Sequence, residues 1–202
     1  MNLIDITNKN IKEQFAIKNN EDYFIFCVGS GSAELSFNID AKNINANIYG
    51  VVISKNQEGV NLKTSLVHNV PDSKSWFHLK GLFFDSAKMD FEGMIKIEQN
   101  AENSDAYLKN DNLVIGENAI VNSAPQLEIK NQNVKASHGV TIKTLEEAEF
   151  FYMQSRVLPK KEAEMLLIKG FVLDLLNKYV DPSSANENDH KLIDYVLHGL
   201  EV

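Results

Sequence analysis

The stretch AELSFNID, residues Ala33–Asp40, alternates apolar and polar side chains without a break. Successive side chains of a β-strand point to opposite faces, so this period of two predicts a half-buried strand. The same alternation returns at 60–66 and 87–91. Further short strands are expected at 23–28, 48–53, 76–84, 94–97, 113–115, 119–121, 127–129 and 134–142.

Polar runs that favour turns separate these strands, and no helical pattern interrupts them before residue 144. The runs lie at 55–59, 71–73, 100–103 and 131–133. Many short, evenly spaced strands joined by turns are typical of a β-sandwich, a β-barrel or a β-helix. Periodicity leaves these three architectures open, because no exact repeat occurs, although units of similar length recur.

A helical pattern replaces the strand pattern at about Thr144. Thr144-Leu145-Glu146-Glu147 fits a capping box and predicts a short helix to about Arg156. Pro159 is suited to open a second helix, because the first helical position needs no N–H group. Asp181-Pro182 is expected to end it, and a third amphipathic helix is expected near the C-terminus. The sequence therefore divides into a β body, residues 1–143, and a small C-terminal α-helical domain, residues 144–202.

Composition narrows the classes of function. The chain has 202 residues and a formal net charge of −8, and Arg156 is its one arginine. An acidic chain repels phosphate backbones, which argues against nucleic acid as a partner. No apolar run reaches the ~20 residues of a membrane span, and the first residues do not resemble a signal peptide. With one cysteine, Cys27, and no internal disulfide, we expect a cytoplasmic protein without membrane contact. The abundant asparagine and lysine are interpreted as a trace of genome base composition.

The motifs give no sign of an enzyme. Gly29-Ser30-Gly31-Ser32 follows a strand, but Glu34 stands where a dinucleotide-binding loop needs its third glycine, so a turn is expected. The sequence contains no GxxxxGK[ST] phosphate loop, no HExxH pair and no paired-cysteine zinc pattern. We therefore expect a protein without catalytic residues.

An ordered set of short motifs between Gly81 and Phe171 resembles the C-terminal half of the SufB/SufD family. None of the motifs is specific by itself, but their order is. Two residues depart from the family pattern, since Ala136 stands where SufD-type members often have Cys, and Val157 stands where Gly is usual. The chain is also much shorter than typical members. The motifs are Gly81–Phe84, Phe91–Ile95, Asp105–Tyr107, Asn112–Ile115, Pro125–Ile129, Val134–Gly139, Phe150–Arg156, Lys161–Glu164 and Gly170-Phe171.

The resemblance implies a right-handed parallel β-helix followed by a small C-terminal helical domain. It also implies a non-catalytic scaffold for iron–sulfur cluster assembly that acts with a SufC-type ABC ATPase held by the helical end. Family members pair through the β-helix, so a homodimer or a SufB/SufD-like heterodimer is expected. A transient, labile iron–sulfur cluster, or none, is the expected cofactor.

His138 and Glu128 are the candidate metal ligands. Imidazole and carboxylate both suit iron, and the resemblance implies a functional His at the position of His138, at the dimer interface. The strand period places His138 on one face with Val134, Ala136, Val140 and Ile142, and this apolar face is predicted to be buried. A lone His on such a face is more often a core residue than a metal ligand. Glu128 is expected to point away from the core, where a solvated carboxylate is the simpler interpretation.

Two further groups of residues have both a functional and a structural interpretation. Cys27 lies in an apolar strand, and one thiol per chain cannot hold a cluster, so a structural Cys is favoured. The expected ATPase contact consists of helical residues that could equally pack the tail onto the β body. These are Phe150, Phe151, Tyr152, Arg156, Leu166 and Phe171.

Two alternative functions stay open. One is an interaction module that binds the ATPase but has lost cluster chemistry, which the short length and scarce cysteine favour. The other is a β-helical carbohydrate-active enzyme such as a polysaccharide lyase, which would need clustered carboxylates or basic residues in a groove.

Overall fold

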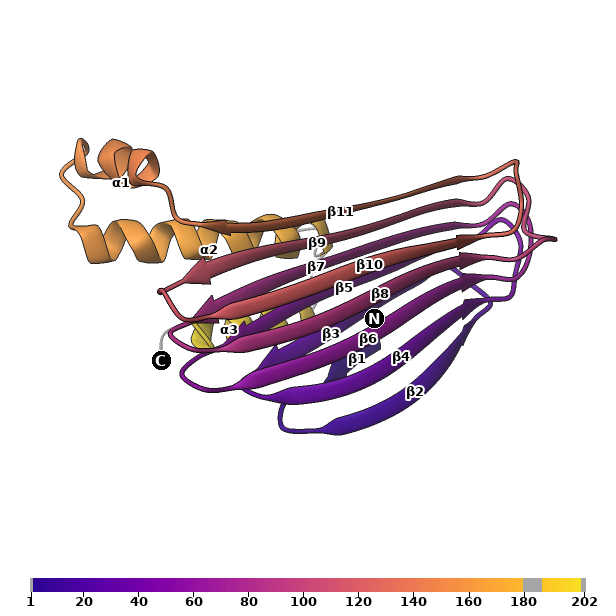
Figure 1. Cartoon of the computed structure of the whole chain (residues 1–202), viewed down its shortest axis with the longest axis horizontal. Helices are drawn as coiled ribbons and strands as arrows, with labels where there is room; N and C mark the ends of the chain where they lie inside the picture. Colours follow the sequence, from indigo (N-terminus) through magenta and orange to yellow (C-terminus); the bar gives the residue numbers. More distant parts are fainter. Residues whose placement is uncertain (1, 180–186, 201–202) are drawn as a thin grey trace.

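The computed structural model describes residues 2–179 and 187–200, and it consists of eleven strands followed by three helices (Figure 1). The helices are α1 (Glu147–Gln154), α2 (Lys160–Tyr179) and α3 (Glu187–His198). The strands are β1 (Asn2–Asp5), β2 (Asn10–Ile17), β3 (Glu21–Val28), β4 (Gly31–Ile39), β5 (Asn45–Ser54), β6 (Gly59–His68), β7 (Lys74–Phe84), β8 (Lys88–Ile97), β9 (Asp105–Ile115), β10 (Ile120–Ile129) and β11 (Lys135–Thr144).

The strands wind into a parallel β-solenoid of about 4 turns. Odd-numbered strands form one sheet in the order β1-β3-β5-β7-β9-β11, and even-numbered strands form a second sheet in the order β10-β8-β6-β4-β2. Every described strand pair is parallel. This arrangement confirms the β-helix implied by the family resemblance, and it excludes the sandwich and the barrel that periodicity had left open.

Asparagine and aspartate shape the corners between the sheets. Asn43, Asp72 and Asn103 occupy equivalent corners of successive coils and adopt positive φ values of 58°, 59° and 57°. Asn and Asp tolerate this left-handed conformation better than other residues with a Cβ. Their side chains also stack: Asn103 Nδ2 donates to Asp72 Oδ1 at 3.0 Å, and Asn133 Nδ2 donates to Asn103 Oδ1 at 2.8 Å. At these positions asparagine therefore has a structural role that the interpretation of its abundance as a trace of base composition did not include.

The interior of the solenoid holds the main apolar core. The inward residues of each strand are every second one, so the predicted alternation at Ala33–Asp40 becomes the buried row Ala33, Leu35, Phe37 and Ile39. Equivalent residues of successive coils stack on one another in register, as Phe15, Phe37 and Leu66 do. Rows of this kind bury apolar side chains continuously along the solenoid axis.

A second core lies outside the solenoid, between the β1-to-β11 sheet and the helices. Phe26, Val51 and Leu82 point outward from the sheet and pack against helical residues such as Val172 and Val196. This contact fixes α2 and α3 on the sheet, whereas α1 extends beyond the strands (Figure 1). No helix in the described part of the chain is long and apolar enough to cross a bilayer.

Several predicted boundaries are wrong in detail. The capping box is formed by Glu146 and Glu149, not by Thr144, because β11 continues through Thr144 and delays the start of α1. The strands expected at 119–121 and 127–129 are one strand, β10, and only the end of β9 was expected. Strands β1 and β2 were not expected at all. Pro159 does precede α2, with its carbonyl accepting a hydrogen bond from the Ala163 N–H at 2.9 Å; the expected stop at Asp181-Pro182 lies outside the described residues.

Candidate functional site

The last coil, made of β10 and β11, exposes part of what is core elsewhere in the solenoid. The inward side chains of β10 and β11 are covered by the preceding coil, β8 and β9, but no described coil follows to cover them from the other side. Ile142 is consequently 49% exposed although it occupies a core row, and its stacking partner Asn112 is fully buried. Leu127, Ile129 and Val140 are large apolar side chains exposed in the same way. The C-terminal coil therefore presents an apolar surface and two strand edges that can pair with another chain.

His138 lies on this open end. Its row runs from Phe77 through Leu108 to His138, so the imidazole sits on buried apolar side chains and faces outward along the axis. The prediction that its face is buried is wrong: His138, Val140 and Ile142 do share one inward face, but no described coil covers it. An exposed imidazole among apolar neighbours is accessible to a metal or to a partner.

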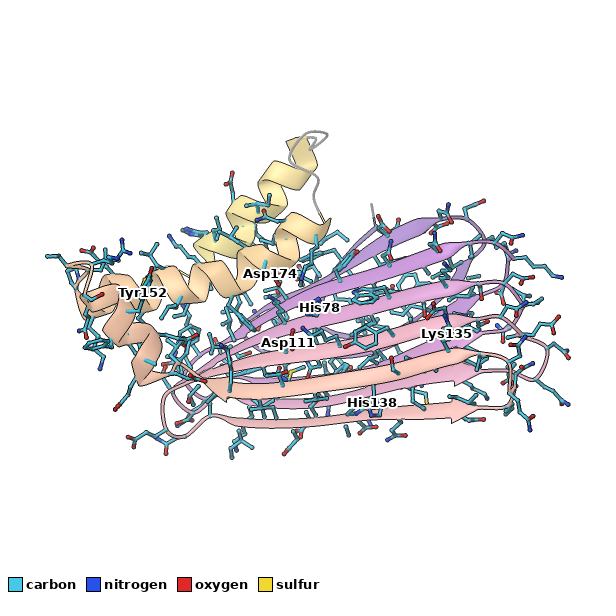
Figure 2. The ribbon with its side chains drawn as sticks, turned by 90° about the horizontal axis from the view of Figure 1, so that it is seen from above. His78, Asp111, Lys135, His138, Tyr152 and Asp174 are labelled. Atoms are coloured by element: carbon cyan, nitrogen blue, oxygen red, sulfur yellow. The ribbon has the colours of Figure 1, made fainter. Side chains whose placement is uncertain are left out.

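Glu128 does not join His138. It points to the outside of the solenoid, as expected from the strand period, and its Oε1 lies 3.6 Å from Lys96 Nζ and 3.3 Å from Lys130 Nζ. Figure 2 shows His138 on the strands, away from helix α1, which carries Tyr152. Within the described residues, no three His, Cys, Asp or Glu side chains gather at one point to hold a metal ion.

A polar network forms the floor beneath the open end. Asn110 and Asn112 point into the solenoid from β9, and Asn112 Nδ2 donates to Asn110 Oδ1 at 2.7 Å. Ser123 Oγ donates to the same Asn110 oxygen at 2.8 Å, which ties β10 to β9. Buried amides are costly unless paired, so this network holds the last coil in a defined position. Sequence reasoning missed it, although two asparagines among the otherwise apolar inward residues of β9 are a visible signal.

Cys27 lies inside the solenoid, far back from the open end. Its side chain is fully buried and its Sγ is 3.9 Å from the Gly29 carbonyl oxygen. Burial raises the pKa of the Cys27 thiol to about 12, so the thiol stays protonated at neutral pH. This placement agrees with the structural interpretation of Cys27.

The helical arm formed by α1 and the start of α2 carries a second exposed apolar surface. Phe151 is 75% exposed, and Tyr152 and Leu166 are also large and exposed. Arg156 lies over the Tyr152 ring at 5.5 Å, and its Nη2 donates to the Tyr152 hydroxyl at 3.4 Å. Phe150 is half-buried beneath Lys160, whose Nζ is 5.5 Å from the ring centre.

Phe171 belongs with the packing of α2 rather than with this exposed surface. It is packed against the second core, and Lys80 Nζ lies 4.5 Å from its ring centre. Lys80 rises from β7 and donates to the Phe171 carbonyl oxygen at 2.6 Å and to Asp174 Oδ2 at 2.7 Å. Burial lowers the pKa of Lys80, while the hydrogen bond from Lys80 lowers the pKa of Asp174. This pair anchors α2 to the sheet.

A second charged cluster lies beside that anchor. His78 Nε2 donates to Asp111 Oδ2 at 2.9 Å, and Lys109 Nζ approaches the same oxygen at 2.7 Å. Burial alone would raise the pKa of Asp111, but hydrogen bonds from His78 and Lys109 hold it well below its ordinary value. The charged groups of this cluster are paired with one another, so we interpret the cluster as a structural feature of the outer sheet face, near α2 (Figure 2).

Comparison with known proteins identifies the family. The model of the SufBD core domain, described as SUF system FeS cluster assembly, matches residues 24–171. The iron-sulfur cluster assembly protein SufD of Escherichia coli is 30% identical over 140 residues, which are 69% of this chain and 33% of that protein. SufD of Bacillus subtilis is 30% identical over 128 residues, 63% of this chain and 29% of that protein.

A SufBD family protein of Synechocystis is 40% identical over 92 residues, 46% of this chain and 20% of that protein. The chain therefore spans about a third or less of the length of these curated relatives. The matched residues include the solenoid from β3 onward, the open C-terminal coil with His138, and the helical arm. The chain belongs to the SufBD family of iron–sulfur cluster assembly proteins.

Proposed function

We propose that this protein is a non-catalytic scaffold subunit that pairs with a second SufBD-type chain through its C-terminal coil and carries a SufC-type ABC ATPase on its helical arm. The observation that carries the proposal is the open coil itself. The inward rows that end in exposed Leu127, Ile129, Val140 and Ile142 need a cover to bury these side chains. A second chain with the same kind of end would cover it and would be covered in turn, as in an isologous pair.

His138 is the residue through which the pair would handle its cargo. One imidazole cannot hold iron or a cluster, and in the described part of one chain no three His, Cys, Asp or Glu side chains gather to complete a site. Pairing at this end would bring a ligand from each chain to a shared point. Bound iron would then be labile, completed by the second chain and by exogenous thiols, which suits a protein that passes its cargo on.

The ATPase contact is assigned to a different surface from the open coil, the helical arm formed by α1 and the start of α2. Phe151, Tyr152 and Leu166 are exposed there without packing the β body, and such side chains are typical anchors of protein interfaces. Because Lys80 ties α2 to β7, a movement imposed on the arm would be transmitted to the sheet that ends at β11. Nucleotide chemistry would take place in the ATPase and not in this chain.

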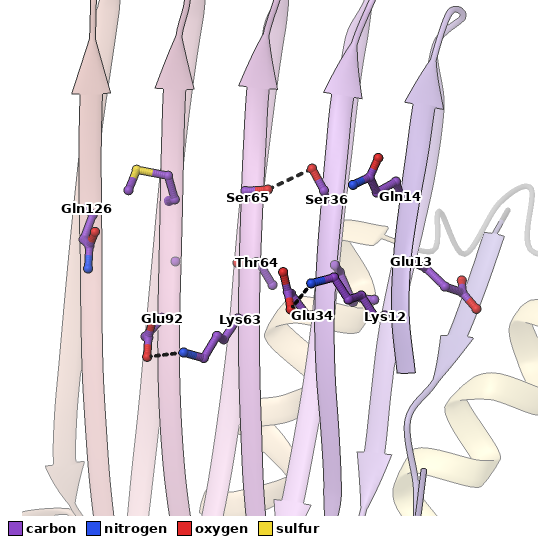
Figure 3. A pocket seen from close by; sticks show the side chains of 13 residues that line it. Lys12, Glu13, Gln14, Glu34, Ser36, Lys63, Thr64, Ser65, Glu92 and Gln126 are labelled. Atoms are coloured by element: carbon purple, nitrogen blue, oxygen red, sulfur yellow. Dashed lines mark hydrogen bonds and ion pairs between the residues drawn. The ribbon is translucent and has the colours of Figure 1, made fainter. Parts of the chain in front are cut away.

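One of the alternatives keeps specific support. A module that binds the ATPase without cluster chemistry would show the same arm and the same open end, with His138 serving only the interface. A carbohydrate-active enzyme has less support. The groove on the outer face of the even-numbered sheet contains Glu34 and Glu92, but Lys12 and Lys63 pair with them at 2.8 Å, so these carboxylates are not available as an acid and a base (Figure 3).

Anaerobic iron reconstitution with His138→Ala tests the cargo role. Ser137→Ala is the matched control, because Ser137 is the neighbouring residue on β11 and points to the opposite face. The proposal expects both variants to fold and to bind the ATPase, with iron binding and function in cells lost only in His138→Ala. Full complementation by His138→Ala together with unchanged iron binding would leave the interaction module as the better account.

A further inference from the structure

The two ends of the solenoid differ in the chemistry of their inward rows. At the C-terminal end, the inward positions of β10 and β11 carry no carboxylate in the described structure. At the N-terminal end, Glu13 of β2 occupies an inward position, since it pairs with Leu35, a fully buried member of the core. Figure 3 shows Glu13 pointing off the edge of β2, away from its neighbour Lys12 and from Glu34. Within the described residues, Glu13 has no hydrogen-bond or ion-pair partner.

A second inward carboxylate stands beside the same opening. Glu21 begins β3 and pairs with buried Ala46, which gives it the inward parity. It accepts hydrogen bonds from the Tyr23 hydroxyl at 2.7 Å and from Asn2 Nδ2 at 3.3 Å, so it is partly satisfied where it stands. These two side chains line a shallow opening between β1 and β2, together with apolar Ile11 and Phe15.

Apart from these carboxylates, the N-terminal end would fit the C-terminal end of another copy. The in-register ladder of the even-numbered sheet runs from Phe15 through Phe37, Leu66 and Ile95 to Leu127. If a second copy continued that ladder, its Phe15 would lie on Leu127. In the same way its Ile17, which heads the row that ends at Ile129, would lie on Ile129. These are apolar contacts of the kind that hold neighbouring coils together inside the chain.

The row that contains Glu13 breaks this fit. It runs from Glu13 through Leu35, Thr64 and Gly93 to Pro125, so continued stacking would place the carboxylate of one copy on Pro125 of the next. Thr64 Oγ1, in the middle of this row, already lacks a hydrogen-bond partner among the described residues. Burying an ionised carboxylate without a partner is strongly unfavourable, and inward charged residues are a known way to keep a sheet edge from pairing.

We infer that Glu13 is a specificity-determining residue that prevents head-to-tail stacking, so that association through the open C-terminal coil stops at two chains. An apolar coil end that met an apolar N-terminal end would propagate without closure and form filaments. The inward carboxylate at one end restricts association to pairs of C-terminal ends. This inference deepens the proposed function and rests on it for the closed pair.

The test is the size distribution of Glu13→Leu between 5 and 200 µM by sedimentation velocity. Gln14→Leu is the matched control, because it adds the same side chain to the adjacent, outward position of β2. The inference expects oligomers larger than those of the wild type that grow with concentration in Glu13→Leu, while Gln14→Leu keeps the wild-type size. Adding Ile142→Asp to Glu13→Leu is expected to abolish this growth.

The size of Glu13→Leu oligomers is compared with that of the wild type, so the inference about Glu13 can fail or hold independently of the closed pair. If folded Glu13→Leu, verified by circular dichroism, has the wild-type size at every concentration, the inference is overturned. If the wild type is monomeric throughout, the closed pair of the proposed function fails, yet growth of Glu13→Leu into long oligomers would still show that this carboxylate blocks stacking.

Discussion

Ile142 offers the sharpest test of pairing through the C-terminal coil. Complete burial of an Ile side chain is worth about 1.5–3 kcal/mol, and Ile142 is 49% exposed, so about 1 kcal/mol remains to be gained when a partner covers it. A symmetric pair contains the residue twice, which gives about 2 kcal/mol. This corresponds to roughly a 30-fold change in dissociation constant.

Ile142→Thr removes most of this apolar surface but keeps a β-branched side chain that suits a strand. We expect the dissociation constant of the pair to rise about 30-fold, measured by sedimentation equilibrium. The melting temperature of the separated chain should change little, because the removed atoms face the open end. Ile120→Thr is the matched control, since Ile120 is 51% exposed on β10 but points to the outside of the solenoid.

Equal dissociation constants for the wild type, Ile142→Thr and Ile120→Thr would refute this reasoning. So would a comparable loss of pairing in both variants, because it would show that general surface hydrophobicity, and not the inward row of the last coil, drives association.

Four further predictions follow from the structure. Burial lowers the pKa of His68 from 6.5 to about 4, so the contribution of neutral His68 to stability is complete above pH 6.5 and falls by up to about 3 kcal/mol as the pH drops from 6.5 to 4. His68→Gln should flatten this slope in urea titrations, and an unchanged slope would contradict the prediction. Asp174→Asn leaves buried Lys80 without its counter-charge and should lower the free energy of unfolding by about 1–3 kcal/mol, less than for a fully buried pair because Asp174 is half exposed. Lys178→Gln should show no such loss in thermal unfolding, and equal losses in the two variants would contradict the role of the Lys80–Asp174 pair as an anchor. Val157 is strained at φ 65°, so Val157→Gly should slow hydrogen exchange in α1 by stabilising the turn by about 1 kcal/mol; unchanged or faster exchange would contradict this. Phe151→Ser should weaken ATPase binding at least tenfold in calorimetry without lowering the melting temperature, and unchanged affinity would remove Phe151 from the contact.

The alternation of apolar and polar residues predicted which side chains face inward, but not how the strands are arranged. Parity is a local property, and a sandwich, a barrel and a solenoid all have it. The corners carry the missing information, because Asn43, Asp72 and Asn103 recur at intervals of about 30 residues. The repeat is one of conformation and not of identity, so Asn and Asp alternate within it and no exact repeat is visible.

The environment of His138 shows a second limit. The sequence correctly grouped His138 with Val140 and Ile142, yet the predicted burial was wrong. Whether an inward row is buried depends on the presence of a following coil, which is not a property of the row. The family resemblance added what periodicity could not, because it implied an interface at this coil.

The contacts beneath α2 were beyond the reach of sequence reasoning for a different reason. Lys80 and Asp174 are separated by 94 residues, and neither lies in a recognisable motif. The visible signal was the presence of His78 and Lys80 in a strand, Lys74–Phe84, that is otherwise largely apolar. By contrast, the departure at Val157 was visible in the sequence, and its positive φ is a conformation that the Gly expected there from the resemblance would adopt without strain.

The most direct test of the central claim is a binding measurement between this chain and the SufC-like ABC ATPase of the same organism. The two proteins would be co-purified, and the mass of the complex would be measured by native mass spectrometry. The account predicts a stable complex of two copies of each chain, which loses the ATPase in Phe151→Ser and separates into halves in Ile142→Asp. No complex at concentrations well above micromolar would contradict the scaffold function and leave the SufBD fold as the only property shared with the family.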